Sequence, residues 1–275
     1  MSHLALTAYS DILESLRAKW FIVYTAVFGG LLILLLLFGI TESRVMGFTG
    51  LSRLLVTYIQ LSVAILPVFV LITTVRSVAG DREAGVFEYL LALPIGLGSW
   101  YWGKLLGRFT VVFLPVVLAM FGGVAWGALR GAEVPLPLLL YYTALLMALT
   151  WCFLGIGMLI STLARSADVA QGAAFIVWLT LLLFLDVVLL GVMIRGSLPP
   201  EAAVGIALAN PMQVFRTAAM MLFDPQLVML GASAYVILDH FGTGGYILYA
   251  LLYPSALGTL CAWLGYRAFR SSDLP

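Results

Sequence analysis

Gly98 to Lys104 is the stretch of this chain that comes nearest to a nucleotide-binding motif. It matches the Gly-x-x-x-x-Gly-Lys part of a phosphate-binding loop, with Gly103 and Lys104 at its end. That loop needs a Ser or Thr hydroxyl directly after the lysine to bind magnesium, and Leu105 stands there instead. Any ATP chemistry coupled to this chain is therefore expected to come from another polypeptide.

Asp186 is the sharpest single polar feature, because it is an ionisable group inside the apolar run 169–194. Such a group is costly at membrane depth unless it is paired or wetted. One interpretation makes Asp186 part of a gate or a cation-handling vestibule. The other makes it an acid that reaches the outer interface, where Arg195 or Arg44 could pair with it.

Motifs of intramembrane enzymes are absent from the sequence. It contains no His-Glu-x-x-His and no Gly-x-Ser-x-Gly, and no second membrane-depth carboxylate accompanies Asp186. A self-sufficient transporter should show broken helices and polar groups at the midplane, and three of the apolar runs are almost free of them. We therefore predict no catalytic residue and no metal site.

The composition places these residues in a membrane protein. The chain has 275 residues, of which 63% are hydrophobic and 10% charged, with a mean hydropathy of +1.10 and a net charge of +1. Soluble domains have about 45–50% apolar and about 25% charged residues, so that class is excluded. The near-zero charge leaves no basic surface for nucleic acid. Cys152 and Cys261 each lie inside an apolar run, which indicates neither a disulfide framework nor a zinc site.

Six apolar runs are long enough to cross a hydrocarbon core about 30 Å thick. They are residues 20–40, 54–75, 105–129, 138–163, 169–194 and 245–269. In lipid every backbone polar group needs a partner within the protein, and the runs lack the alternation of barrel strands, so we expect helices. The predicted fold is all-α, with 1–275 as a single transmembrane domain. The first run is longer than the apolar part of a cleavable signal and is interpreted as a retained span.

Lys and Arg residues favour one orientation. With both termini in the cytoplasm, nine lie inside and five outside, in agreement with the positive-inside rule. The inner set is Arg17, Lys19, Arg76, Arg82, Lys104, Arg108, Arg165, Arg267 and Arg270, and the outer set is Arg44, Arg53, Arg130, Arg195 and Arg216.

Residues 4–18 predict an amphipathic helix at the inner membrane surface. Leu4, Ala8, Ile12 and Leu16 recur every four residues, and polar residues such as Asp11 lie opposite them. The alternative is a weakly ordered terminus.

Two pairs of glycines in the third run predict close helix contacts. Gly103 with Gly107, and Gly123 with Gly127, form small-x-x-x-small faces. Internal packing is favoured over a dimer seam.

The loop between spans two and three predicts a helix over 81–93 that is charged and apolar at once. Asp81, Arg82 and Glu83 supply charge, the residues from Val86 onward can form an apolar side, and Pro94 stops the helix. Such a segment suits docking into the cleft of a soluble partner, because apolar anchors supply affinity and charges fix the register. An interfacial helix resting on lipid would show the same pattern.

The long outer segment 195–244 contains apolar stretches that are too short to span. Breaks at Asn210-Pro211 and Asp224-Pro225 predict re-entrant or interfacial helices. The segment either docks a periplasmic partner or caps the bundle.

The loop after span two resembles the coupling region of the ABC-2 type permeases. Its string from Gly80 to Pro94, with Gly103-Lys104 downstream, is similar to the family's Glu-x-Gly-(Thr)-x-x-x-Leu-Leu-x-x-Pro and following Gly-Lys. Val86 departs from this pattern, since many relatives have Thr there. Softer similarities favour the permeases of copper-related ABC complexes. They are Gly47-Phe48-Thr49, Trp178 through Asp186, Asn210-Pro211 and Phe215-Arg216.

The resemblance implies an ABC-2 (type V exporter-like) permease fold and a non-catalytic homodimeric subunit of the bacterial inner membrane. Its partners would be a cytoplasmic ABC ATPase, which binds ATP and magnesium, and a periplasmic β-helical protein. The ATPase-coupling residues would be Asp81, Arg82, Glu83, Gly85, Phe87, Glu88 and Leu90. Docking of the periplasmic partner would involve Asn210, Pro211, Phe215 and Arg216.

The same resemblance implies a role in copper-site maturation of nitrous oxide reductase. The complex would act by transport of copper or sulfur species or by mechanical transmission, and the alternative is an exporter of a lipid, drug or polymer. Soft sulfur ligands prefer Cu(I). However, the methionines of the last outer segment, Met212, Met220, Met221 and Met229, follow no ligand spacing and are interpreted as packing residues, so no cofactor is expected in this chain.

Overall fold

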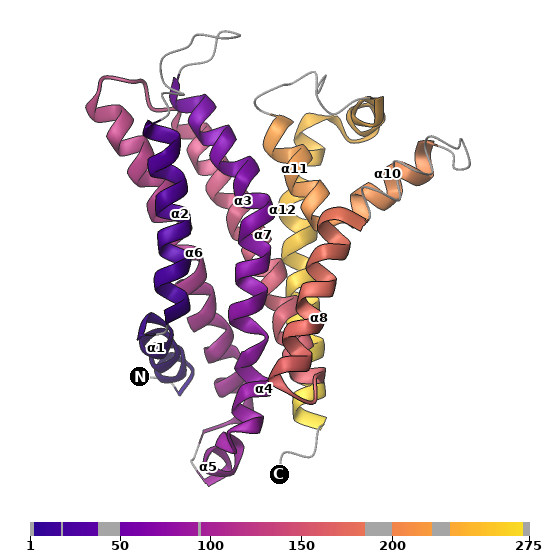
Figure 1. Ribbon diagram of the computed structural model, residues 1–275. Coiled ribbons are helices and arrows are strands. Elements are labelled where there is room, and N and C mark those ends of the chain that lie inside the picture. The colour runs from indigo at the N-terminus through magenta and orange to yellow at the C-terminus, as the bar shows by residue number, and fades with distance from the viewer. Residues whose placement is uncertain are drawn as a thin grey trace.

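The computed structural model describes residues 3–17, 19–37, 50–92, 95–184, 200–221 and 232–271. All regular structure in these ranges is helical, as predicted (Figure 1). The helices are α1 (His3–Arg17), α2 (Lys19–Leu37), α3 (Gly50–Thr74), α4 (Arg76–Glu83), α5 (Val86–Ala92), α6 (Leu97–Leu129), α7 (Leu136–Leu163), α8 (Ala167–Leu179), the π-helix η1 (Thr180–Phe184), α10 (Pro200–Ala209), α11 (Pro211–Met221) and α12 (Ala232–Ser271).

Four helices in the described ranges are long and apolar enough to cross a membrane: Leu54–Glu83, Leu97–Leu129, Leu136–Leu163 and Gly242–Ser271. Helix α2 would add a fifth, as a bent pair with α1 whose axes differ by 71°. The predicted run 169–194 begins as α8 and η1, but its outer end, with Asp186, lies outside the described residues. The count of six spans therefore stays a prediction.

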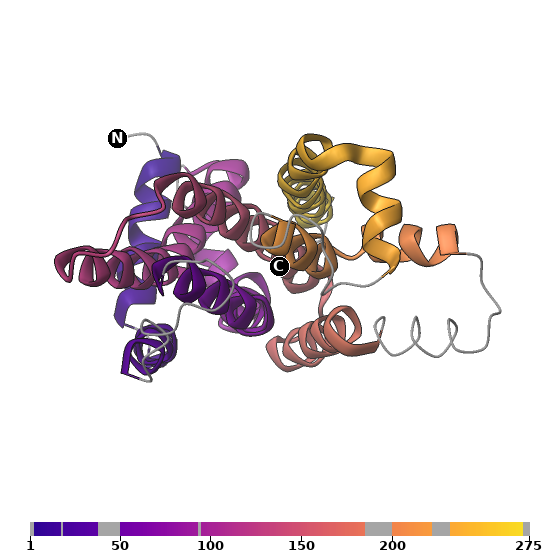
Figure 2. The same ribbon diagram turned by 90° about the horizontal axis from the view of Figure 1, so that it is seen from above.

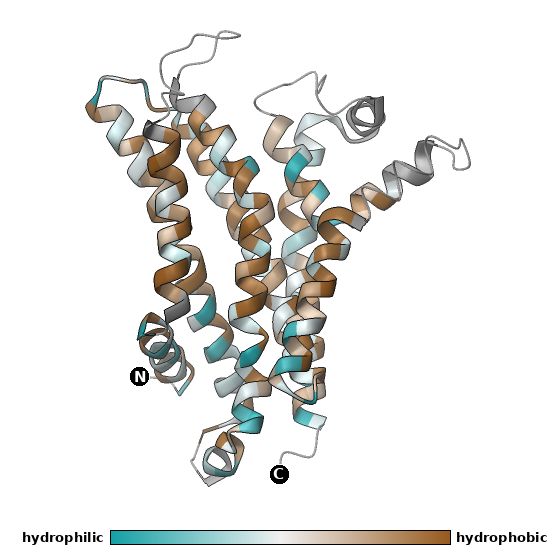
Figure 3. Ribbon diagram, viewed as in Figure 1, coloured by the Kyte–Doolittle hydropathy of each residue, from teal (hydrophilic) through white to brown (hydrophobic). Residues whose placement is uncertain are grey.

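The bundle has one polar end. Helices α1 and α5 and the C-terminal end of α12 lie together there (Figure 1). Hydrophilic residues gather toward this end, whereas the middle of the long helices is hydrophobic (Figure 3). Seen from above, α7 lies between the helices that precede it and the α8–α12 group (Figure 2), and it packs against α3, α6, α8 and α12.

Helices α7 and α12 cross at two glycines, Gly155 and Gly258. A Cβ added at Gly155 would overlap the carbonyl oxygen of Gly258, and one added at Gly258 would lie 2.7 Å from Cys152 Cα. Trp151 Nε1 donates a hydrogen bond to Thr259 Oγ1 at 2.9 Å beside this contact. Small residues at a crossing allow backbones to approach closely in a membrane, where packing rather than water exclusion holds helices together.

Replacing Gly155 by alanine is expected to destabilise the protein by about 1–3 kcal/mol, because the added methyl group overpacks the crossing. Gly122→Ala in α6 is the matched control, since a Cβ there meets nothing within 4 Å. The control should be neutral or stabilising by up to about 1 kcal/mol, because alanine favours helix. Thermal unfolding of both variants in the same detergent tests the prediction, and equal melting temperatures would contradict it.

Helices α10 and α11 form a short hairpin broken at Asn210 (Figure 1). The last carbonyls of such half-helices need partners in a membrane. Four tyrosines from α7 and α12 donate hydrogen bonds to them. Tyr249 and Tyr253 bind Leu208 O (2.9 Å) and Ala209 O (2.6 Å) in α10, and Tyr141 and Tyr142 bind Ala218 O (2.8 Å) and Ala219 O (2.9 Å) in α11.

Candidate coupling site

The hydrogen-bond pattern of the span 54–83 is interrupted at Val75, between α3 and α4, although Val75 itself keeps helical φ and ψ (−65°, −18°). We refer to this interruption as the Val75 break. The first amides of α4 have no capping side chain of their own segment. Ser161 of α7 replaces it, because its Oγ accepts hydrogen bonds from Val78 N (2.9 Å) and Ala79 N (3.0 Å). Backbone groups at the Val75 break are therefore satisfied by a neighbouring helix, as buried backbone polar groups in a membrane protein must be.

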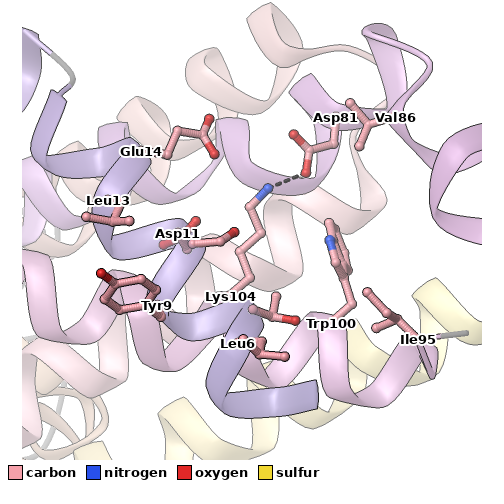
Figure 4. A pocket seen from close by; sticks show the side chains of 12 residues that line it. Leu6, Tyr9, Asp11, Leu13, Glu14, Asp81, Val86, Ile95, Trp100 and Lys104 are labelled. Atoms are coloured by element: carbon pink, nitrogen blue, oxygen red, sulfur yellow. Dashed lines mark hydrogen bonds and ion pairs between the residues drawn. The ribbon is translucent and has the colours of Figure 1, made fainter. Parts of the chain in front are cut away.

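Two cationic side chains, one helical turn apart on α6, donate hydrogen bonds to backbone carbonyls on either side of this break. Lys104 Nζ donates to Ser77 O at 3.0 Å, and Arg108 Nη1 donates to Thr73 O at 2.7 Å. Lys104 is 6% exposed and also forms an ion pair with Asp81. Figure 4 shows Lys104 reaching from α6 to Asp81, with Asp11 beside it.

Asp81, Arg82 and Glu83 tie the end of α4 to three different helices. Asp81 pairs with Lys104 of α6. Arg82 donates to Ala164 O (3.0 Å) and Thr162 O (3.3 Å) at the C-terminal end of α7, and Glu83 Oε1 accepts from Ala167 N (3.1 Å) at the start of α8. Arg82 and Glu83 each meet a helix end of opposite partial charge, whereas Asp81 meets the ammonium group of Lys104. All three were predicted to couple to the ATPase; each is engaged within the chain in this structure, and the coupling role stays a prediction.

The predicted helix over 81–93 is wrong as a single element. Helix α4 ends at Glu83, and α5 runs only over Val86–Ala92. Gly85 separates them with φ +67°, a left-handed conformation that glycine adopts without steric cost and that commonly terminates helices. Leu93 and Pro94 lie outside the described residues.

Helix α5 is fastened to the bundle by Phe87, which is 3% exposed. Its ring centroid lies 5.4 Å from those of Trp100 and Phe269. In this structure its surface is buried within the chain, and the role of Phe87 in coupling to the ATPase stays a prediction. The opposite side of α5 presents Glu88 and Tyr89, and both residues are exposed. Tyr89 is 75% exposed. The side chain of Leu90 lies outside the described ones.

Tyr89 is the residue that sequence reasoning missed at this site. It follows Phe87 by two positions, so a seven-residue helix that buries Phe87 turns Tyr89 toward the opposite side. An exposed tyrosine on a helix with a free face is typical of an interface anchor. The spacing of Phe87 and Tyr89 in the sequence could have identified Tyr89 as exposed, but only if Phe87 had been known to face the bundle.

Helix α1 packs against α6 through its polar side. A Cβ at Gly103 would lie 2.8 Å from Leu4 O, and one at Gly107 would lie 2.8 Å from Ala8 O, which confirms that these glycines serve internal packing. Asp11 is 3% exposed and its Oδ1 accepts from Arg108 Nε at 3.3 Å. Asp11 was predicted on the polar side of an interfacial helix; it is in fact buried against α6, where Arg108 is its partner.

The exposed side of α1 is apolar: Leu6, Tyr9, Leu13 and Leu16 are each 39–55% exposed. This face suits a membrane surface, although that location stays a prediction. A cavity of about 670 Å³ separates α1 from α5 and is lined by Asp11, Glu14, Asp81 and Lys104 among apolar neighbours (Figure 4).

Burial raises the pKa of Asp11 above its usual value of 3.8, against the opposing attraction of Arg108 and Lys104 and with a smaller contribution from Glu14. A raised pKa means that the folded protein holds this proton more tightly than the unfolded chain does. The stabilisation is thus complete below about pH 4 and is lost as the pH rises through the raised pKa.

Asp11→Asn is expected to remove this pH dependence. Between pH 4 and pH 7 the melting temperature of the wild type should fall relative to that of the variant by a few degrees, given about 2–4 °C per kcal/mol for chains of this size. Thermal unfolding across this range measures it, with the exposed Glu133→Gln as control. Parallel profiles for the wild type and Asp11→Asn would contradict the prediction.

The residues predicted to dock an outer partner have other roles. Asn210 is 1% exposed; its Nδ2 donates to Leu181 O at 2.7 Å and its Oδ1 accepts from Met212 N at 3.0 Å, so it caps α11 and ties the hairpin to η1. Pro211 and Phe215 are buried, and Arg216 is half-buried. Docking of an outer partner through these residues stays a prediction. Asp186 lies outside the described residues, so its two interpretations stay open.

Comparison with known proteins gives a consistent result. The profile of the family described as ABC-2 family transporter protein matches residues 7–274. A protein of Stutzerimonas stutzeri named "Probable ABC transporter permease protein NosY" is 27% identical over 216 residues, which cover 76% of this chain and 78% of that protein. A protein of the same name from Pseudomonas aeruginosa is 25% identical over 224 residues, covering 79% and 81%.

Proposed function

Because this chain belongs to the ABC-2 family of transporter proteins, we propose that it is the membrane subunit through which a separate cytoplasmic ATPase exerts force. One observation carries the proposal. Helix α5 offers Glu88 and Tyr89 on its free side, while α4 is bound directly to α6, α7 and α8. A displacement of α5 therefore has a route to three membrane helices.

The proposed route from α5 to the membrane helices contains a rigid contact and a more easily deformed junction. The Phe87 ring holds α5 on Trp100 and Phe269, so α5 moves with the inner ends of α6 and α12. The break at Val75 is the more easily deformed junction, since its backbone groups depend on side chains of other helices. We propose that closure of the ATPase pair pushes α5, and that the change is taken up at this break and converted into tilting of the spans.

The similar proteins named NosY support a more specific proposal. In this proposal, two copies of the chain form a homodimer in the bacterial inner membrane, with both termini in the cytoplasm. A NosF-like ATPase and a NosD-like periplasmic β-helical protein complete the complex. Its role in denitrification would be maturation of the copper sites of nitrous oxide reductase, through transport of a copper or sulfur species or through mechanical transmission to the periplasmic partner.

Deletion of this chain from a host that makes nitrous oxide reductase tests the specific role. The reductase is expected to accumulate without its full copper content, and wild-type chain supplied in trans should restore it. A reductase with full copper content in the deletion strain would overturn the copper role and leave export of a lipid, drug or polymer. Copurification of the ATPase with the tagged chain tests the general role separately.

A further inference from the structure

A second cavity, of about 350 Å³, lies at the junction of α1, α2, α3–α4 and α6. One part of its wall is apolar and comes from the inner ends of the predicted spans: Phe21, Tyr24, Ile72, Val111 and Val112. The other part is polar and carries Glu14 and Ser15 of α1, Arg76 of α4, the ion-paired Asp81 and Arg108, and Thr73 and Ser77. The cavity is thus amphiphilic, and in the predicted orientation it lies toward the cytoplasmic end of the spans.

Several polar groups of this wall are available to bind a ligand. Ser15 is 7% exposed, and its buried Oγ has no hydrogen-bond partner among the residues that the structure describes. Arg76 and Glu14 are exposed, and neither forms a salt bridge within the described ranges. A buried hydroxyl without a partner is costly and is rare in folded proteins, which points to a ligand that completes it.

The wall also presents charges of both signs. A guanidinium binds phosphate strongly, and a carboxylate binds an ammonium group. Basic sites between membrane helices on the cytoplasmic side are typical places for lipid headgroups. Glu14 in the same wall would repel a headgroup that is only anionic and attract one that also carries an amine.

We propose that this cavity binds an inner-leaflet glycerophospholipid with a primary amine headgroup, of the phosphatidylethanolamine class. Arg76 binds the phosphate, Glu14 binds the ammonium group, and Ser15 Oγ donates to a phosphate or glycerol ester oxygen. The apolar wall takes the beginning of the acyl chains. A volume of about 350 Å³ is at the small end of ligand sites, about 300–1,000 Å³, and suits a headgroup with its glycerol while the chains continue into the bilayer.

The test uses the full chain, purified in detergent and delipidated. Dioleoyl phosphatidylethanolamine, dioleoyl phosphatidylglycerol and water-soluble phosphoethanolamine are added separately, and binding is measured by native mass spectrometry and by the shift in melting temperature. Phosphatidylethanolamine is expected to bind at least about tenfold more tightly than phosphatidylglycerol, because only the former pairs with Glu14. Equal binding of the two lipids would overturn the proposal, as would an equal response to phosphoethanolamine alone.

Variants assign the contacts. Arg76→Gln should weaken phosphatidylethanolamine binding about tenfold and Arg76→Lys should restore most of it, whereas Arg165→Gln, an exposed arginine outside the cavity, should change nothing. Glu14→Gln should abolish the preference for phosphatidylethanolamine over phosphatidylglycerol. If Glu14→Gln keeps that preference, or Arg76→Gln binds as the wild type does, the assignment fails. Copurification of the ATPase is a separate readout, so failure here is distinguishable from failure of the proposed function.

Discussion

Lys104→Met is expected to destabilise the protein by about 3 kcal/mol and to remove the ATP-dependent function of the complex. Lys104 and Asp81 have side chains that are only 8% and 23% exposed, so the substitution leaves a carboxylate buried without its partner. Breaking a buried pair costs about 3–5 kcal/mol, and the partial exposure of Asp81 favours the lower end of that range. The same change removes the donor from Ser77 O at the Val75 break.

Chemical unfolding in detergent measures this loss, with the exposed Arg165→Met as the matched control. The double variant Lys104→Met with Asp81→Asn should recover part of the stability, because no buried charge is left unpaired. It should not recover function, since the α4–α6 link is still absent. Unfolding of Lys104→Met at the same denaturant concentration as Arg165→Met would refute this account of the break.

Tyr89→Ala and Phe87→Ala are expected to fail in opposite ways. Tyr89 is 75% exposed, so its removal should leave the fold intact and weaken binding of the ATPase by about thirtyfold, the effect of losing an interface anchor worth about 2 kcal/mol. Phe87 is 3% exposed, so its truncation should instead cost about 3–5 kcal/mol of stability by opening a cavity against Trp100 and Phe269.

Quantitative pull-down of the ATPase and thermal unfolding, applied to both variants, separate the two roles. Glu133→Ala, exposed and remote in sequence from α5, controls for surface changes. If Tyr89→Ala retains wild-type ATPase affinity, the free face of α5 is not the docking surface. If Phe87→Ala unfolds at the wild-type temperature, Phe87 does not anchor α5.

The positions of the long spans could be predicted from the sequence because the length of an apolar run is sufficient to identify a spanning helix. The third and fourth predicted runs end at Leu129 and Leu163, as α6 and α7 do. Asn210 before Pro211 also indicated the break in the hairpin, since an asparagine followed by proline favours a helix start. Local residue types were sufficient in each of these cases.

The coupling site was less readable because its partners are distant in the chain. Asp11 pairs with Arg108, 97 positions away, and Arg82 binds carbonyls about 80 positions away, so no local pattern reveals either contact. An apolar stripe such as that around Phe87 is the same whether it faces the chain's own core or a partner. Gly85 was noted as part of a motif, but its role as a helix terminator depends on a positive φ that the motif does not state.

The close contact between Gly155 and Gly258 also has a mechanical meaning. A rod that pivots about a fixed point swings its two ends in opposite directions. Gly155 lies about 12 Å from the C-terminal end of α7 and about 20 Å from Tyr141 and Tyr142 on its other side, at 1.5 Å per residue. Arg82 binds the C-terminal end of α7, and the two tyrosines bind α11. A small displacement near Arg82 would therefore reach the α11 hairpin reversed in direction and enlarged about 1.7-fold, the ratio of the two distances from the crossing.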